Sequence, residues 1–331
     1  MVMSVVAASA VSTAQAFCPG HITGFLAKAS DLGRYNNHKE NGNHKSSYLN
    51  MGSLGAGLAI DRGITTTVKV CERGDNHTRT TYDVSINGSN QNSNMDVTKS
   101  VVEDYIELLR GKSYYIKIEH ETSIPIGYGL SSSGAAALSL SYALNNALNV
   151  GLDIEQAAQI AHCSEIECKT GLGSVLAQYG GGFELRSRIG APGVGVIDKI
   201  ASYSTLQNLK VVILCLSPVS TKKFLTERVE LLNGFGEKML ERLKASRNMS
   251  EFLDMSFDFA NSIGLIQGRS RTLIGRLKSL GFGSSIALFG NTIFSIVKSS
   301  AVSEVINCLE GYGGRLLICD VDHYGARLVD I

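Results

Sequence analysis

A glycine- and serine-rich segment in the middle of the chain has the residue types of an anion-binding loop. Residues 125–136 are Pro-Ile-Gly-Tyr-Gly-Leu-Ser-Ser-Ser-Gly-Ala-Ala, and a run of small apolar residues with helical character continues from them. Gly127 and Gly129 let the backbone adopt unusual angles and approach a ligand closely. The N-terminus of a helix attracts anions through its unpaired N–H groups and its dipole, and successive amides form a concave nest for phosphate oxygens.

The serines of this segment, Ser131, Ser132 and Ser133, have more than one use. Their hydroxyls can cap the helix, bond to phosphate or hold Mg²⁺. The segment is not a Walker A loop, because no Lys follows the second glycine, and it lacks the full spacing of a dinucleotide-binding loop. On residue types alone, a helix cap and a phosphate site both remain open.

Strands and helices must position this loop, and the hydrophobic pattern predicts them on both sides of it. Runs of β-forming residues between polar loops predict strands, and apolar residues at helical spacing predict helices. In the first half, the predicted strands are 11–18, 64–70, 82–86 and 114–118, and the predicted helices are 101–110, 132–148 and 154–167. Asp153 is the expected N-cap of the last helix.

The second half has a different pattern. The predicted order is strand 210–216, helices 222–245 and 252–265, strands 285–289 and 292–297, helix 303–310 and strand 315–320. This order is the split βαβ arrangement of an α+β sandwich. Glycines and a proline cluster within residues 187–204, which places a domain boundary there.

Composition favours a folded protein of two domains. The chain has 331 residues, 44% hydrophobic and 18% charged, against a prior of roughly 150 residues per domain. Its net charge of +1 gives no basic surface for a nucleic acid and no reason to expect a membrane partner. Seven cysteines without a C-x-x-C favour reduced thiols in the cytoplasm over a disulfide framework or a zinc site.

The apolar start of the chain ends in an Ala-x-Ala pattern, as signal peptides do. No Lys or Arg precedes Lys28, and polar residues interrupt the apolar run, so a first strand leading into Phe17 is the better interpretation. No apolar run reaches the roughly 18 to 20 residues that span a bilayer.

The segment 125–136 closely resembles the phosphate-binding motif of the GHMP kinases, a family that includes galactokinase, homoserine kinase and mevalonate kinase. Residues 17–25, Phe-Cys-Pro-Gly-His-Ile-Thr-Gly-Phe, resemble the first motif of that family, and 281–290, Gly-Phe-Gly-Ser-Ser-Ile-Ala-Leu-Phe-Gly, resemble the third. The resemblance implies an α+β, two-domain GHMP-kinase fold. A ribosomal-protein-S5-like α/β domain over 1–195 would bind ATP, and a ferredoxin-like split βαβ domain would span 196–331.

The first motif is similar to that of an archaeal branch of the family that phosphorylates pantoate, and 52–57, 170–173, 190–193 and 290–294 also resemble that branch. The resemblance implies ATP- and Mg²⁺-dependent phosphorylation of the primary hydroxyl of (R)-pantoate to 4-phosphopantoate in coenzyme A biosynthesis. Homoserine or mevalonate as the acceptor, and a non-catalytic nucleotide-binding relative, remain alternatives. A homodimer is also left open.

The resemblance assigns roles to single residues. Ser133 matches the serine that helps hold Mg²⁺, and Glu165 matches the helix carboxylate that completes the metal site, with Glu167 a weaker candidate. Without the resemblance, Glu165 would be taken as a solvated helix carboxylate. The residues matched to the ATP phosphates are Pro125, Gly127, Gly129, Leu130, Ser131, Ser132, Ser133 and Gly134.

The chain departs from the family at Ser174, where many members place an Asp that takes the proton of the acceptor hydroxyl. A neutral serine is a poor proton acceptor. Because positioning and charge neutralisation supply most of the rate of phosphoryl transfer, we hypothesise that Mg²⁺, the amide nest and His21 carry the step. A sharp turn after Pro-Gly would aim the His21 ring into a cleft, and the alternative is a hydrogen-bonded turn residue.

The carboxylate of the acceptor requires charged or amide donors. Lys28, Arg34, Arg62 and Arg186 are candidates by composition, with a surface charge as the alternative for each. Arg186 is favoured because it ends the strand expected after three glycines, in the region that shapes the acceptor pocket. The other expected substrate contacts are His21, Thr23, Ser53 and Gly55, although the last two would alternatively form a turn between strands.

Overall fold

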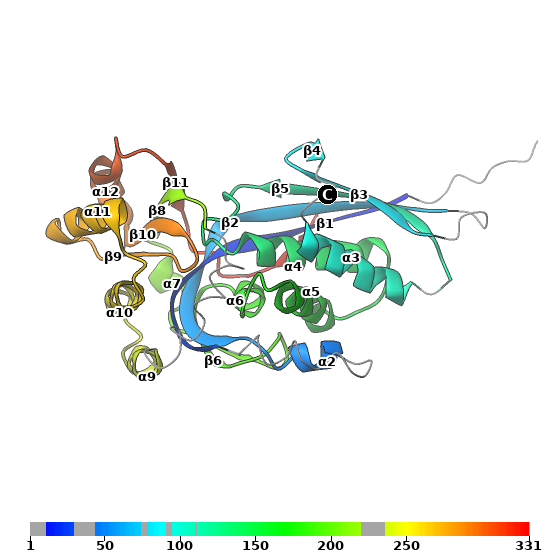
Figure 1. The fold of residues 1–331 in the computed structure, drawn as a ribbon, viewed down its shortest axis with the longest axis horizontal. Helices are drawn as coiled ribbons and strands as arrows, with labels where there is room; N and C mark the ends of the chain where they lie inside the picture. The colour runs from blue at the N-terminus through cyan, green and yellow to red at the C-terminus, as the bar shows by residue number, and fades with distance from the viewer. Residues whose placement is uncertain are drawn as a thin grey trace, which may run out of the picture.

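A computed structural model describes residues 11–29, 44–73, 79–90, 95–109, 111–219 and 236–330. Two long antiparallel strands, β1 (Val11–Ala29) and β2 (Ser53–Glu72), form the centre of the first sheet and bend together along the molecule (Figure 1). In the described residues this sheet has the order β12-β1-β2-β5-β3-β4, and β6 and β7 continue from the start of β2. The remaining strands are β3 (Thr81–Ile86), β4 (Ser89–Asn90), β5 (Tyr114–Thr122), β6 (Phe183–Arg188), β7 (Val196–Lys199) and β12 (Arg327–Val329).

Helices cover one side of this sheet (Figure 1). Helix α4 (Ser132–Ala147) packs directly on β1 and β2, and α5 (Ile154–Cys168) packs on α4. Most of α4 is buried, and its small side chains allow the close approach that a central helix needs. The neighbouring helices are α2 (His44–Tyr48), α3 (Asp96–Leu108), α6 (Ser174–Gly180) and α7 (Tyr203–Leu206).

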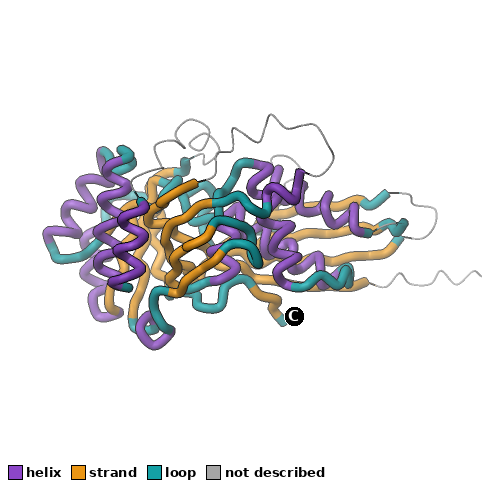
Figure 2. Tube along the Cα trace, turned by 90° about the horizontal axis from the view of Figure 1, so that it is seen from below, coloured by secondary structure: helices purple, strands orange, loops and turns teal. Residues whose placement is uncertain are grey.

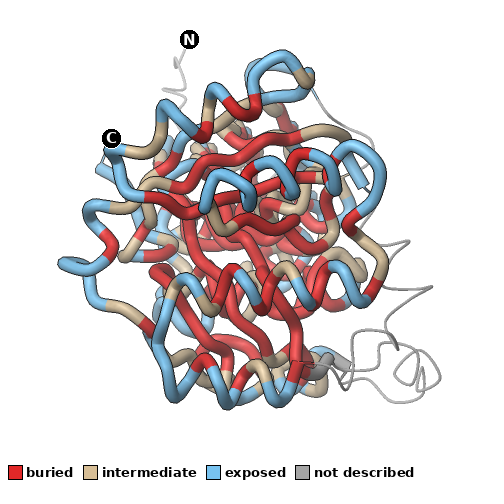
Figure 3. Tube along the Cα trace, turned by 90° about the vertical axis from the view of Figure 1, so that its left-hand side faces the viewer, coloured by how far each residue is buried: buried red, intermediate tan, exposed pale blue. Residues whose placement is uncertain are grey.

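The second sheet has the order β11-β8-β10-β9 in the described residues, with every pairing antiparallel. Its strands and helices lie together at one end of the molecule (Figure 2). Viewed from that end, buried strands lie behind helices whose outer sides are exposed (Figure 3). Its elements are β8 (Leu209–Ser217), α9 (Glu237–Ser246), α10 (Met249–Ser262), α11 (Gly268–Ser279), β9 (Ser284–Ile286), β10 (Asn291–Lys298), a 3-10 turn (Ser299–Ala301), α12 (Val302–Leu309) and β11 (Arg315–Cys319).

An aromatic cluster joins the two sheets. The ring of Phe252 on α10 contacts Phe25 of β1, Phe183 of β6 and Phe294 of β10, with centroids 5.0 to 6.4 Å apart. A Cβ atom at Gly24 would lie 2.5 Å from the Phe252 ring, so only glycine fits at this point of β1. This shared core holds the first motif against the second sheet.

The structure confirms the expected α+β organisation and corrects several boundaries. The first strand does not end at Cys18 but continues to Ala29, so His21 follows a bulge between Pro19 and Gly20 and not a sharp turn. Ser53 and Gly55 lie within β2, where they pair with β1, and form no turn between strands. β9 ends at Ile286, before the expected 289. Helix α9 lies at the end of the expected helix 222–245, of which residues 222–235 lie outside the described residues.

The division of the chain between the sheets is not sequential. β7 (Val196–Lys199) pairs with β6, and β12 pairs with β1, so both belong to the first sheet. The second sheet starts at Leu209. The expected domain boundary between residues 195 and 196 would therefore separate β7 from β6, its partner in the first sheet. It would also assign β12, which pairs with β1, to the second domain.

Candidate active site

The segment 125–136 forms a loop whose backbone alternates between left-handed and ordinary conformations. Gly127, Gly129 and Ser131 have φ of +85°, +76° and +55°, and Tyr128 and Leu130 between them do not have positive φ. Alternation of this kind turns successive N–H groups toward one side, which is the geometry of an anion nest. The loop ends at the N-terminus of α4, where further N–H groups are unpaired within the helix.

Ser131 holds a left-handed conformation that costs a residue with a Cβ about 1 to 2 kcal/mol. Two contacts fix it. The Ser131 hydroxyl donates to the carbonyl of His21 at 3.2 Å, and the Ser131 carbonyl accepts from Nε2 of Gln178 at 3.1 Å. Gln178 is fully buried and also donates to the Pro19 carbonyl at 2.7 Å, so it fastens the loop to the first motif.

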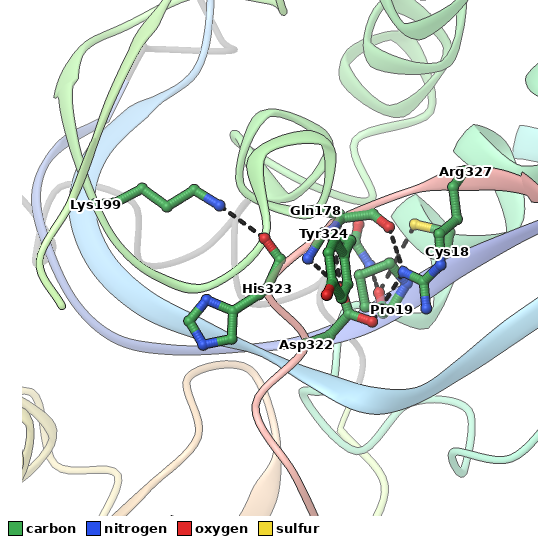
Figure 4. A network of polar contacts seen from close by, with 9 residues as sticks. Cys18, Pro19, Gln178, Lys199, Asp322, His323, Tyr324 and Arg327 are labelled. Atoms are coloured by element: carbon green, nitrogen blue, oxygen red, sulfur yellow. Dashed lines mark hydrogen bonds and ion pairs between the residues drawn. The ribbon is translucent and has the colours of Figure 1, made fainter. Parts of the chain in front are cut away.

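Residues near the C-terminus contact the segment around Gln178, and Asp322 and Arg327 lie close to it (Figure 4). The carbonyl of Gln178 accepts from the amide of Ala326 at 2.9 Å. The turn before Ala326 is fixed by Asp322, whose carboxylate accepts from the amide of Gly325 at 2.8 Å and from Nη1 of Arg327 at 2.9 Å. The segment 322–327 therefore helps to hold Gln178, which in turn holds the loop at Ser131.

The three motifs, which lie far apart in the sequence, meet at this loop. The amide of His21 donates to the Leu130 carbonyl at 3.1 Å, and the amide of Leu288 donates to the Thr23 carbonyl at 3.2 Å. A Cβ at Gly129 would lie 2.7 Å from the carbonyl oxygen of Leu288, so the third motif leaves room for glycine alone. The 281–290 segment therefore shapes the phosphate loop from the second sheet.

A cavity of about 60 Å³ lies between the motifs. Eight of the residues expected at the site line it: Thr23, Ser53, Gly127, Gly129, Ser131, Ser132, Ser133 and Arg186. Of the other lining residues, Thr170, Gly171, Leu172, Leu288 and Phe289 lie in segments that carry the family resemblance, Ser174 is the position where the chain departs from the family, and Leu26 was not singled out. The cavity lining does not include the other expected residues Pro125, Leu130, Gly134, Gly55, His21 and Glu165.

A buried carboxylate lies at the base of this cavity. Glu165 on α5 is 1% exposed, and it accepts hydrogen bonds from the hydroxyls of Ser133 at 2.6 Å, Thr170 at 3.3 Å and Ser174. Burial raises the pKa of Glu165, and these hydrogen bonds oppose the rise. A Cβ at Gly171 would overlap Oε2 of Glu165, so glycine is required beside it.

The oxygen atoms around Glu165 fit a hard divalent cation. Carboxylate and hydroxyl oxygens are the ligand types that Mg²⁺ prefers, usually with phosphate oxygens completing the shell. In the part of the chain that the structure describes, no basic side chain forms an ion pair with Glu165. Glu167, the weaker candidate, is exposed and accepts from Ser100 in a separate cleft, so it is not part of this group.

A second charged group lies fully buried beside the cavity. Nε2 of His21 contacts Oε1 of Glu184 at 2.9 Å, and Nη1 of Arg186 lies 3.7 Å from the same oxygen. Burial lowers the pKa of His21, and its hydrogen bond to Glu184 opposes this. From the sequence we expect the His21 ring to point into a cleft, but the ring is fully buried. It lies behind Thr23, whose Oγ1 is 3.4 Å from Nδ1 of His21.

Arg186 has the features of an anion receptor. It is 1% exposed, it lines the cavity, and its Nε and Nη2 atoms have no hydrogen-bond partner among the described residues. Buried N–H groups without hydrogen-bond partners are costly, so Nε and Nη2 point to a ligand that pairs with them. Arg62 is exposed on β2 and does not line the cavity, whereas Arg34 and the side chain of Lys28 lie outside the described residues.

Sequence reasoning missed Glu184. A signal was available, because Glu184 and Arg186 are two residues apart in one strand and so share a face of the sheet. The contact of Glu184 with His21 could not be predicted from the sequence, because β1 and β6 are not paired with each other and are brought together by their common neighbour β2.

An apolar pocket of about 240 Å³ adjoins the cavity and shares Ser132, Ser133 and Thr170 with it. Its apolar lining residues are Ile64, Ile86, Met95, Val97, Ile126 and Ala136. A flat, largely apolar group next to an anion nest is the shape of a nucleoside joined to phosphates.

Comparisons with known proteins agree with this site. The model of the GHMP kinases N terminal domain matches residues 96–182. The chain is 31% identical to the pantoate kinase of Methanocaldococcus jannaschii over 92% of this chain and 99% of that protein. It is 30% identical to the pantoate kinase of Thermococcus kodakarensis, over 88% and 89% of the two chains. A solved phosphotransferase related to the CoA biosynthesis pathway superposes with a TM-score of 0.79 at 26% identity, covering 96% and 98%.

The chain belongs to the GHMP kinase family of small-molecule kinases, whose two-domain fold it has. Within that family it is similar to pantoate kinases along nearly its whole length. None of the helices in the described ranges is long and apolar enough to cross a membrane.

Proposed function

We propose that this protein transfers the γ-phosphoryl group of ATP to the primary hydroxyl of pantoate, in the route to coenzyme A. The observation that carries this proposal is the buried Arg186, which lines the same cavity as the amide nest and has two guanidinium nitrogens without hydrogen-bond partners among the described residues. A small acid with a hydroxyl places its carboxylate on the guanidinium and its hydroxyl toward the phosphate. The relatives named pantoate kinase support the choice of acid.

The nucleotide is proposed to bind with its base in the apolar pocket and its phosphates in the nest. Ser132 and Ser133 line both the pocket and the cavity, and the nest at Gly127–Ser131 lies between them and the third motif. Bound phosphate oxygens would accept from the backbone amides and from the α4 N-terminus. The chain thus supplies most of its phosphate contacts from main-chain atoms.

Ser133 and Glu165 are the proposed protein ligands of Mg²⁺. Their side-chain oxygens lie 2.6 Å apart at the base of the cavity, next to the phosphate nest. When bound, the ion would neutralise charge on the transferred phosphoryl group. Thr170 and Ser174 orient the Glu165 carboxylate through their hydroxyls.

The acceptor is proposed to lie between Arg186 and the nest, with Thr23 and Ser53 on the walls. Gly55 contributes space, because a Cβ there would lie 2.9 Å from Nη2 of Arg186 and would block the guanidinium. A bidentate pair between the guanidinium and a carboxylate fixes both distance and angle. The buried cysteines Cys18, Cys163, Cys215, Cys308 and Cys319 are in no disulfide, which supports the proposed location in a reducing cytoplasm.

An ADP-release assay over pantoate, homoserine, mevalonate and galactose tests the proposal. We expect ADP release above background with pantoate and Mg²⁺, and phosphorylated pantoate as the product by mass spectrometry. If the protein prefers another acceptor, the proposed substrate is wrong but the proposed kinase activity stands. Nucleotide binding without turnover on any acceptor would favour the non-catalytic relative, an alternative that the absence of a carboxylate at Ser174 keeps open.

A further inference from the structure

The hydrogen bonds around His21 define which of its nitrogens carries a proton. Oε1 of Glu184 is 2.9 Å from Nε2, and an ionised carboxylate can only accept, so Nε2 is the protonated nitrogen. Burial lowers the pKa of His21, so the ring is neutral near pH 7 and Nδ1 holds a free lone pair. Nδ1 faces the hydroxyl of Thr23 at 3.4 Å.

Thr23 connects this buried pair with the cavity. It lines the cavity, while His21 and Glu184 behind it are both fully buried. The backbone of Thr23 is fixed by the third motif, whose Leu288 amide donates to its carbonyl. The hydroxyl thus lies between a shielded base and the place where the acceptor binds.

The arrangement has the order hydroxyl, imidazole, carboxylate, in which the carboxylate selects the tautomer and stabilises the imidazolium. Ser174, by contrast, donates its only proton to Glu165 and offers no basic group. The chain therefore has a route for the acceptor proton in the first motif and none at the position where a carboxylate is usual.

We propose that Thr23, His21 and Glu184 form a proton relay that accepts the proton of the acceptor hydroxyl during phosphoryl transfer. The proposal rests on the proposed kinase function. Thr23 is the catalytic hydroxyl, and His21 and Glu184 are positioning residues that act through it.

The step balances as follows in atoms and charge. The acceptor oxygen forms a bond to the γ-phosphorus as the bond from that phosphorus to the bridging oxygen of ADP breaks. The acceptor proton passes to Oγ1 of Thr23 while the Thr23 proton passes to Nδ1 of His21. The imidazolium is stabilised by Glu184, and the proton returns through Thr23 to solvent after the products leave.

The charged groups that face His21 in the described structure are Glu184 and Arg186, both from β6. Glu184 favours the imidazolium and Arg186 disfavours it. We therefore expect kcat to fall on acidification with an apparent pKa below the usual 6.5 of histidine, because protonated His21 cannot accept a proton.

Substitution of Thr23 tests the relay with little change in shape. We expect Thr23→Val to lower kcat by about 100-fold or more, with KM for ATP within threefold and the acidic limb of the pH profile lost. Thr23→Ser keeps the hydroxyl and should exceed Thr23→Val by at least tenfold in kcat. Thr292→Val is the matched control, because Thr292 is a fully buried strand threonine that does not line the cavity.

Glu184→Gln is a second substitution that tests the relay. It preserves the size of the side chain and removes the charge, so we expect a lower kcat and a solvent deuterium isotope effect that differs from the wild type. Binding of a non-hydrolysable ATP analogue checks that each variant is folded. Thr23→Val with kcat within threefold of wild type, or an unchanged acidic limb, overturns the relay. A wild-type protein that is inactive on pantoate overturns the proposed function instead.

Discussion

Replacement of Arg186 by Lys tests the placement of the acceptor. Lysine retains a positive charge toward Glu184, which limits the cost of leaving that carboxylate buried, and it loses the planar fork that grips a carboxylate. The two guanidinium atoms without partners are Nε and Nη2, which are the pair that a bidentate carboxylate uses.

The magnitude follows from that geometry. A hydrogen bond to a charged group contributes about 1.5 to 3 kcal/mol, so loss of one of the two bonds should raise KM for pantoate about 10- to 150-fold. KM for ATP should change less than twofold, because Arg186 does not line the apolar pocket. Steady-state ADP release with either substrate varied measures both constants.

An acceptor without the carboxylate completes the test. The primary amide of pantoate should be a poor substrate for the wild type, and Arg186→Lys should penalise it much less than it penalises pantoate. If Arg186→Lys leaves KM for pantoate within threefold, or penalises acid and amide equally, the carboxylate does not bind at Arg186 and the reasoning is refuted.

Three further substitutions test the rest of the site. Ser174→Ala should leave turnover within about tenfold, or 1.4 kcal/mol, because Ser174 only orients Glu165; a loss of several orders of magnitude in kcat would contradict this. Glu165→Gln should lower kcat about 1000-fold at fixed Mg²⁺ and shift the Mg²⁺ titration to higher concentration, whereas an unchanged titration would remove Glu165 from the metal site. Gly129→Ala should weaken binding of an ATP analogue at least tenfold by calorimetry, because the new Cβ would lie 2.7 Å from the carbonyl oxygen of Leu288; unchanged affinity would show that the loop does not form the nest.

Local patterns predicted much of the fold because they depend on neighbours in the chain. The helix predicted over 132–148 is observed as Ser132–Ala147, and the capping box at Asp153 starts α5 as expected. The predicted strand 11–18 was too short. Pro19 and Gly20 interrupt the β pattern in sequence, but pairing with β2 and a bulge carry β1 through them.

Residue types and order predicted a glycine- and serine-rich loop at the start of a helix, as either an anion site or a helix cap, and resemblance to a known family supplied the three motifs and the role of Glu165. These depend on short stretches of chain. Tertiary structure decided the rest. The pairing of β6 with β2 brings Glu184 behind His21 and turns Arg186 toward the cavity. The third motif closes against Gly129 from another sheet, and the last strand returns to support Gln178. These contacts join residues more than 100 positions apart in the chain. The spacing of residues within a short stretch of sequence cannot predict them, because they form only when the strands pair.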